Sequence, residues 1–212
     1  KDTDGGAITS GSIATILASN DNMFIGYNSG SGNWCNGGAA AASEYNVAVG
    51  NWTMDGALQG ANRNTCVGYN SLTAITTGDQ NVAVGSGAGE AITTGSDNIV
   101  IGKAAFDANT VGVETIAIGT NALGQANQDD NDGSVAIGHN ALAGQVGAGG
   151  AQFANANIGI GHTAGAAITT GAGNVAVGYR ALNACTTAGS NTVIGYDAAL
   201  LLAGSDNSGA DN

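Results

Sequence analysis

Residues 81–85 read Asn-Val-Ala-Val-Gly, and residues 98–102, seventeen positions further on, read Asn-Ile-Val-Ile-Gly. This five-residue motif occurs ten times: an opening Asn, Thr or Ser, three variable residues of which the third is Val or Ile, and a closing Gly. Five of the nine intervals between closing glycines are 17 residues, and the other four are longer. A fixed period lengthened only by insertions is typical of a solenoid, whose coils stack on their neighbours. The closing glycines are Gly26, Gly50, Gly68, Gly85, Gly102, Gly119, Gly138, Gly161, Gly178 and Gly195.

The variable residues of the motif predict a short strand that is apolar on both faces. The first and third are mostly β-branched, whereas the middle one is mostly Ala or another small residue. Because side chains alternate across a strand, the branched residues share one face and the small residues form the other. A coil has only one interior, so the second face predicts contact with another chain, and we expect the small residues to permit close approach near the axis of a symmetric trimer. Loops or a flanking domain covering this face are the alternative.

The residues around the strand predict how each coil closes. A second short pattern follows the closing glycine, as in residues 69–72 and 120–123, and predicts a second, outer strand. The glycine itself indicates a positive φ or a close backbone approach, and stacked Asn side chains predict amide ladders from coil to coil. The structural repeat residues with these two roles include Asn81, Gly85, Asn98, Gly102, Asn174, Gly178, Asn191 and Gly195.

Two longer stretches carry a family resemblance. Residues 134–142 read Ser-Val-Ala-Ile-Gly-His-Asn-Ala-Leu, and residues 174–182 read Asn-Val-Ala-Val-Gly-Tyr-Arg-Ala-Leu. These resemble the repeats of YadA-like heads of trimeric autotransporter adhesins, and equally the repeats of phage tail fibres. The resemblance covers about residues 22–200 and implies a left-handed, trimeric parallel β-roll displayed on a cell surface or a virion. The 17-residue coil, with its Thr-Thr-Gly turn, is longer than the usual adhesin-head coil and favours the phage or environmental fibre branch.

The expected fold is therefore all-β, a parallel β-solenoid of about ten coils over residues 22–200. Residues 1–21 are interpreted as a lead-in coil and residues 201–212 as the start of a further coil or a truncated end, because the chain has no initiator Met and stops near where the next motif would begin. The function expected is that of a structural and adhesive module of an extracellular or virion fibre. The alternative is a purely structural spacer without a recognition role of its own.

Composition narrows the range of partners. The chain has 37 Gly and no Pro, and its 16 acidic residues against 4 basic ones give a net charge of −12. No basic stripe is present, so binding to nucleic acid or to an anionic membrane surface is disfavoured. No apolar run is long enough to insert into a bilayer. A second copy of the chain and a host glycan or protein remain the expected partners.

Chemical sites have little support in the sequence. No nucleophile, base and orienting acid occur in a recognisable context, so we expect no enzyme, no cofactor and no metal. His139 and His162 occupy the same position in consecutive coils and should lie about 5 Å apart. Other coils place Lys or Thr there, so this position is interpreted as a variable, partly exposed surface and not as a metal site.

The acidic run 128–133 lacks the calcium-loop spacing and is interpreted as a solvated turn. Paired threonines disfavour ice binding because neighbouring side chains point to opposite sides. Cys35, Cys66 and Cys185 fall at three phases and are interpreted as free apolar fillers.

Two insertions carry the remaining hypothesis about binding. Residues 30–42 include Trp34, and residues 144–154 include Phe153; both insertions occur at the same phase of the coil. Insertions in a solenoid form loops, often on the binding face, so Trp34 and Phe153 are candidate contacts to a surface glycan or protein. The alternative is that both aromatic side chains anchor their loops to neighbouring coils or subunits.

Overall fold

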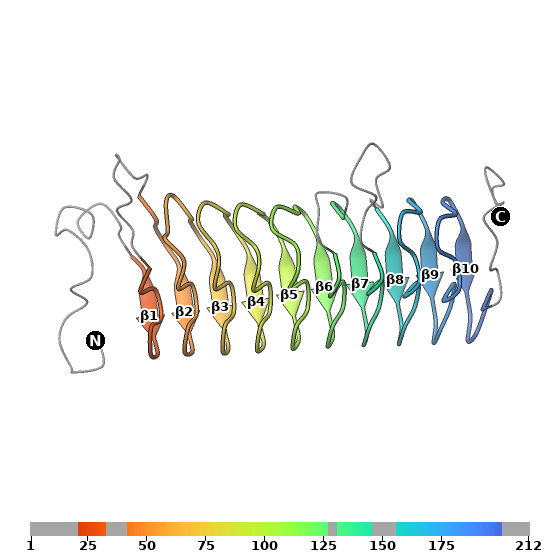
Figure 1. Ribbon diagram of the computed structural model, residues 1–212, viewed down its shortest axis with the longest axis horizontal. Coiled ribbons are helices and arrows are strands. Elements are labelled where there is room, and N and C mark those ends of the chain that lie inside the picture. The colour runs from red at the N-terminus through yellow and green to blue at the C-terminus, as the bar shows by residue number, and fades with distance from the viewer. Residues whose placement is uncertain (1–20, 33–41, 127–130, 146–155, 201–212) are drawn as a thin grey trace.

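A computed structural model describes residues 21–32, 42–126, 131–145 and 156–200. Ten three-residue strands run side by side along a rod, one strand for each copy of the motif (Figure 1). The strands are β1 (Met23–Ile25), β2 (Val47–Val49), β3 (Thr65–Val67), β4 (Val82–Val84), β5 (Ile99–Ile101), β6 (Ile116–Ile118), β7 (Val135–Ile137), β8 (Ile158–Ile160), β9 (Val175–Val177) and β10 (Thr192–Ile194).

All ten strands belong to one parallel sheet in sequence order. The register is one for one, so the middle residue of each strand faces the middle residue of the next, as Ala83 faces Val100. Parallel neighbours in sequence order require the chain to make one full coil between strands, which is the arrangement of a solenoid. The predicted all-β parallel solenoid with a 17-residue period is confirmed, and no helix occurs within the described residues. The left-handed winding and the trimer stay predictions.

The interior of the rod is lined by the small middle residues of the strands. Ala83 and Val100 have no exposed surface and pack in one cluster with Leu72, Ile92 and Phe106 from the turns opposite. The expectation that the small residues face a shared axis between chains is therefore wrong. They face inward because the coil is thin, so that one large side chain from the turn and one small side chain from the strand fill it at native density.

The residues after the closing glycine form turns, so the predicted second strand is also wrong. In the coil of β3, Asn70 has a φ of 55° and Leu72 a φ of 49°. A strand requires a strongly negative φ at every residue, so two left-handed residues two positions apart make a turn and cannot continue a strand. The Leu of this pattern is nevertheless a core residue, and Leu72, Leu123, Leu142 and Leu182 are all fully buried.

The predicted amide ladder is present. The Asn81 Nδ2 donates to Asn64 Oδ1 at 3.0 Å and to the Gly95 carbonyl oxygen at 2.9 Å. In turn, Asn81 Oδ1 accepts the backbone N–H of Asn98 at 3.1 Å and its Nδ2 at 2.9 Å. The same pattern repeats from Asn22 to Asn98 and from Asn157 to Asn191, and it is interrupted where Thr115 and Ser134 open the motif.

The closing glycines meet each other along the rod. Gly85 has a φ of 137°, and a Cβ added to it would lie 2.5 Å from the carbonyl oxygen of Gly102. That contact is too short for any side chain, and the φ is one that L-residues rarely adopt. The same two constraints apply at Gly102 and Gly178, so the glycines of the motif are required by both the turn and the coil spacing.

Candidate interaction surfaces

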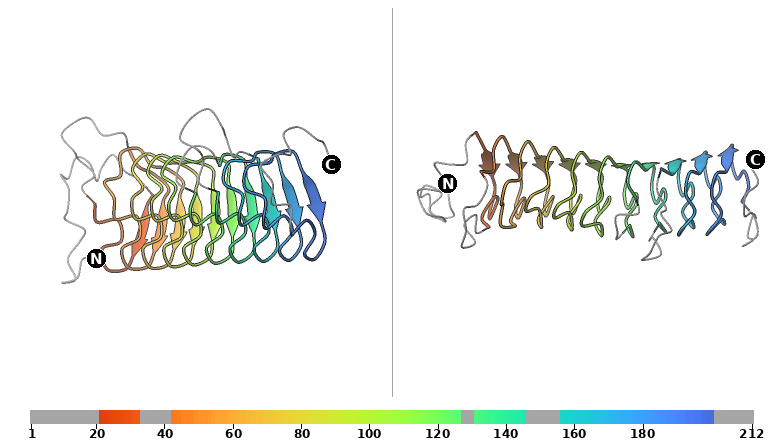
Figure 2. Two further views of the ribbon diagram at one scale, coloured as in Figure 1. Left: turned by 45° about the vertical axis from the view of Figure 1, so that its right-hand side comes forward. Right: turned by 90° about the horizontal axis from the view of Figure 1, so that it is seen from above.

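The first and third residues of the strands form one outward face of the rod, which we call the strand face. Seen from above, the ten strands line one long side and the turns the other, and no described segment lies outside the strands (Figure 2). Val82, Val84, Ile99 and Ile101 each expose more than a third of their surface. All twenty positions of this face are Val or Ile except Met23, Thr65 and Thr192.

The strand face is unusual because it is apolar, continuous and without charge. Ten strands about 4.8 Å apart, each three residues long, span roughly 45 by 10 Å. Continuous apolar patches larger than a few hundred square ångströms are rare on monomers and mark interaction sites. The protein carries sixteen acidic residues, yet none occupies this face. The strand face therefore largely lacks the polar residues typical of the solvent-facing side of a sheet and is a candidate interaction surface.

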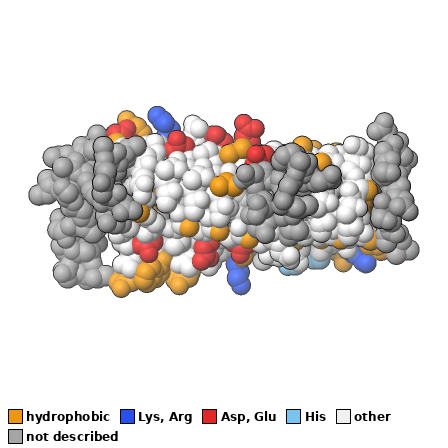
Figure 3. Space-filling model, turned by 45° about the horizontal axis from the view of Figure 1, so that its top comes forward, with side chains coloured by type: hydrophobic (Ala, Val, Ile, Leu, Met, Phe, Trp, Pro, Cys, Tyr) orange, Lys and Arg blue, Asp and Glu red, His pale blue; other side chains and the backbone are white. Residues whose placement is uncertain are grey.

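The edge column is a second surface, made of the residue directly after each closing glycine. Its side chains gather hydrophobic groups near the N-terminal end of the rod and the two histidines towards the other end (Figure 3). Tyr27 exposes 48 % and Tyr69 exposes 55 % of its surface. Trp52 follows this column by one residue and meets Tyr27 edge to face, with ring centroids 5.4 Å apart and planes at 68°.

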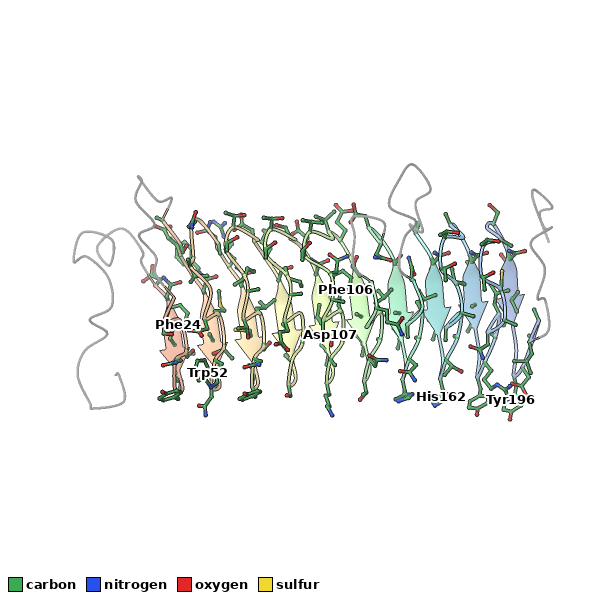
Figure 4. The ribbon with its side chains drawn as sticks, in the orientation of Figure 1. Phe24, Trp52, Phe106, Asp107, His162 and Tyr196 are labelled. Carbon is green, nitrogen blue, oxygen red and sulfur yellow. The ribbon has the colours of Figure 1, made fainter. Side chains whose placement is uncertain are left out.

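The C-terminal part of the edge column is a stack of four parallel rings. His139, His162, Tyr179 and Tyr196 follow one another with centroid distances of 4.9, 5.2 and 5.0 Å and interplanar angles under 20°. The predicted spacing of the two histidines is therefore confirmed, and His162 and Tyr196 lie on the same lower edge of the rod (Figure 4). Stacked imidazoles direct their nitrogen lone pairs in parallel rather than at one point. Within the described residues, no three His, Cys, Asp or Glu side chains form a group that could hold a metal ion.

The two insertions fall largely outside the described residues, and with them both candidate contacts, Trp34 and Phe153, so that hypothesis stays a prediction. The acidic run 128–133 is described only from Asn131 onward. Asp132 Oδ1 accepts the backbone N–H of Val113 from the preceding coil at 2.8 Å. One acid of this run therefore serves the stacking of the coils.

The remaining groups that sequence analysis considered have structural roles where the structure describes them. Cys66 and Cys185 are buried and free, as expected, and burial raises the pKa of the Cys66 thiol to about 12. The first threonine of the Thr-Thr-Gly turns bonds to the next coil: Thr76 Oγ1 donates to the Thr93 carbonyl oxygen at 3.1 Å. This hydroxyl is used within the rod.

One pair of acids lies in neighbouring coils. The pKa of Asp107 is raised by burial above all, an effect that its own backbone N–H hydrogen bond opposes and that the charge of Glu90 reinforces. One Asp107 carboxylate oxygen is buried without a hydrogen-bond partner. The charge of Glu90 in the neighbouring coil thus adds to burial in favouring the protonated form of Asp107.

The two surfaces could not be predicted from the sequence, for different reasons. The edge-column residues were identified but interpreted as variable surface, although six of its ten members are aromatic or His and cluster at the two ends. The strand residues were identified as apolar on both faces, but which face points inward depends on the large turn residues opposite. The signal for that was the Leu that follows the small Ala or Ser in the turn.

No helix among the described residues is both long and apolar enough to cross a membrane. No protein-family model matches this chain, and comparisons with curated proteins and with solved structures likewise yield no match.

Proposed function

We propose that this chain is a structural and adhesive module of a fibre displayed outside the cell, on a cell surface or a virion. The fibre is a homo-oligomer whose copies pack through the strand face. The observation that carries the proposal is the uncharged double column of Val and Ile along the whole rod, represented by Val84 and Ile101 in the centre. An exposed face of this kind favours aggregation unless a defined partner covers it.

A second copy of the chain is the partner that fits the strand face best. Each copy presents the same rows of Val and Ile side chains with the same strand spacing. Copies that run parallel can therefore pack row against row along their full length. Closed symmetric assemblies are the commonest form of self-association, and the resemblance to adhesin-head and tail-fibre repeats favours three copies about one axis. The acidic residues then remain on the outside, where they keep a long fibre soluble.

Charge placed on the strand face tests the assembly. In the double variant Val84→Lys with Ile101→Lys, lysines on both strands oppose the same residues of the neighbouring copies. We expect sedimentation velocity to show dissociated single chains with an unchanged β-type circular dichroism spectrum, because these side chains face solvent in one copy.

The matched control places the same charges on the turn side of the rod. Thr77 and Thr94 are exposed there, so Thr77→Lys with Thr94→Lys should leave the assembly intact. If both double variants sediment like the wild type, the strand face is not the contact between copies.

Shortening the rod distinguishes an adhesive module from a spacer. Deletion of residues 82–115 removes two coils and joins Asn81 to Ile116 in register. An adhesive surface spread along the rod should lose attachment to a panel of bacterial cells and immobilised glycans in proportion to the length removed. A spacer whose recognition lies elsewhere should become shorter and attach as before, which would contradict the adhesive part of the proposal.

A further inference from the structure

Three aromatic side chains group at the N-terminal part of the rod edge, and we call them the aromatic cluster: Tyr27, Trp52 and Tyr69. Both tyrosines are about half exposed, and Trp52 is half-buried. Trp52 lies on the lower edge of the rod, at the same edge as His162 and Tyr196 (Figure 4). The cluster belongs to three successive coils, whose strands are β1, β2 and β3.

Trp52 occupies the turn position at which every coil adopts a left-handed conformation. Its φ is 61°, in the left-handed region. A bulky residue is uncommon there, whereas Asn adopts it readily because its side chain hydrogen-bonds locally. The turn imposes this left-handed φ on every coil, since Ala104, Thr163 and Arg180 adopt it as Asn70 and Asn121 do. The conformation therefore belongs to the fold, and because Asn adopts it readily, Asn at position 52 should not destabilise the rod.

The geometry of the rings separates this cluster from the C-terminal stack. In the stack, His162 and Tyr179 have a neighbouring ring on both faces, whereas His139 and Tyr196 at the ends have one each. Tyr27 and Trp52 instead meet at 68°, and an edge-to-face pair leaves ring faces uncovered. Stacking therefore covers the inner ring faces of the C-terminal group, whereas among the described residues no ring stacks in parallel on Tyr27 or Trp52.

The polar groups of the edge column beside the cluster are neutral, although one carboxylate lies close by, since Glu90 Oε1 accepts from Asn70 Nδ2 at 3.4 Å. The side chain of Asn51, which accepts the Tyr27 backbone N–H at 3.0 Å, is exposed between the two tyrosines of the edge column. No Lys or Arg occupies this column before Lys103, in the fifth coil. Aromatic faces bordered by amides and phenol hydroxyls, without a cation, suit a ligand that has an apolar face and a hydroxylated rim but no charge. A pyranose ring has these properties.

We propose that the aromatic cluster binds the apolar face of a neutral saccharide, with Trp52 as the principal stacking ring. The proposal deepens the adhesive role and rests on it for its biological setting. Asn51 and the two tyrosine hydroxyls are the groups placed to hydrogen-bond the saccharide hydroxyls. Large aromatic residues dominate binding energy where they are desolvated, so Trp52 carries most of the affinity.

The test uses the full chain and three neutral oligosaccharides: cellohexaose, chitohexaose and maltohexaose. Calorimetric titration of the wild type should give saturable binding to at least one of them. In Trp34→Phe, Trp52 is the sole tryptophan, so its fluorescence should change along the same curve. Trp52→Asn should weaken binding by about tenfold or more, with unchanged sedimentation and an equal or higher unfolding temperature.

Tyr179→Thr is the matched control from the C-terminal stack, since Thr120 occupies the same column. It should lower the unfolding temperature through lost stacking and leave saccharide affinity unchanged. The proposal is overturned if none of the three saccharides binds, if Trp52→Asn binds as tightly as the wild type, or if binding is lost in Trp34→Phe alone. It is also overturned if immobilised casein binds and no saccharide does, which would assign the cluster to a protein partner. If Trp52→Asn sediments differently from the wild type, Trp52 is a contact between copies, and the saccharide proposal is overturned. If the wild type is monomeric and still binds saccharide, only the proposed assembly is overturned.

Discussion

At the scale of the residue, a buried asparagine is tolerated only when its donors and acceptors are all used. Each central ladder amide meets this condition through its two neighbours, so one substitution leaves groups unpaired on both sides. Asn81→Ala would abandon Asn64 Oδ1, the Gly95 carbonyl and the Asn98 amide. We expect a loss of about 2–5 kcal/mol in the free energy of unfolding, measured by denaturant titration. Asn81→Thr breaks the ladder but keeps one hydroxyl donor and acceptor, as Thr115 does, and should lose less; an Asn81→Ala variant as stable as the wild type would contradict the ladder's role.

The Cys66 thiol provides a second test at this scale. Its pKa is about 12 in the folded chain against 9.0 in the unfolded one, because burial disfavours the thiolate. The folded state thus keeps a proton that the unfolded state releases, so stability is full below pH 9 and falls as the pH rises towards 12. At pH 10.5 we expect the wild type to lose about 2 kcal/mol relative to Cys66→Ala. Ala occupies this position in five other strands, so parallel pH profiles for the two proteins would contradict the inference.

At the scale of the element, the coil is the unit that the sequence specifies. Deletion of residues 82–98 removes one period and joins Asn81 to Ile99, so strand register, ladder and glycine contacts are all restored. We expect this variant to keep its β-type circular dichroism spectrum and a cooperative thermal transition. Deletion of residues 82–89 removes about half a coil and places turn residues against a strand. If both deletions fold equally well, the coils are not held in register by these contacts.

The motif period predicted the strands and their parallel order because both depend on local repetition. The turn was harder to predict, since Leu72 and Leu123 combine an apolar side chain with a left-handed φ that Leu rarely adopts. Only packing in the interior favours that conformation. The orientation of the strands was missed for the same reason, because Ala83 points inward only where a large turn residue lies opposite it. The aromatic cluster brings together residues of three coils, and their ring angles follow from no spacing in the sequence.

At the scale of the whole molecule, the rod is a thin core with one face uncovered. Stacking satisfies its backbone, its buried amides and the small interior, but it only partly buries the strand face, where Val84 and Ile101 stay more than a third exposed. The hydrophobic effect therefore favours association through that face, at roughly 25 cal/mol for each square ångström of apolar surface removed from water. Fibre assembly and the burial of this face are one and the same event in this account.

The mass of the assembly in solution tests this central claim most directly. Sedimentation equilibrium of the wild-type chain, over a hundredfold range of concentration, should return a single species of three times the 20.4 kDa chain mass. A stable mass of 20.4 kDa throughout that range, with the β-type spectrum intact, would show that the strand face remains exposed to water and would contradict the account.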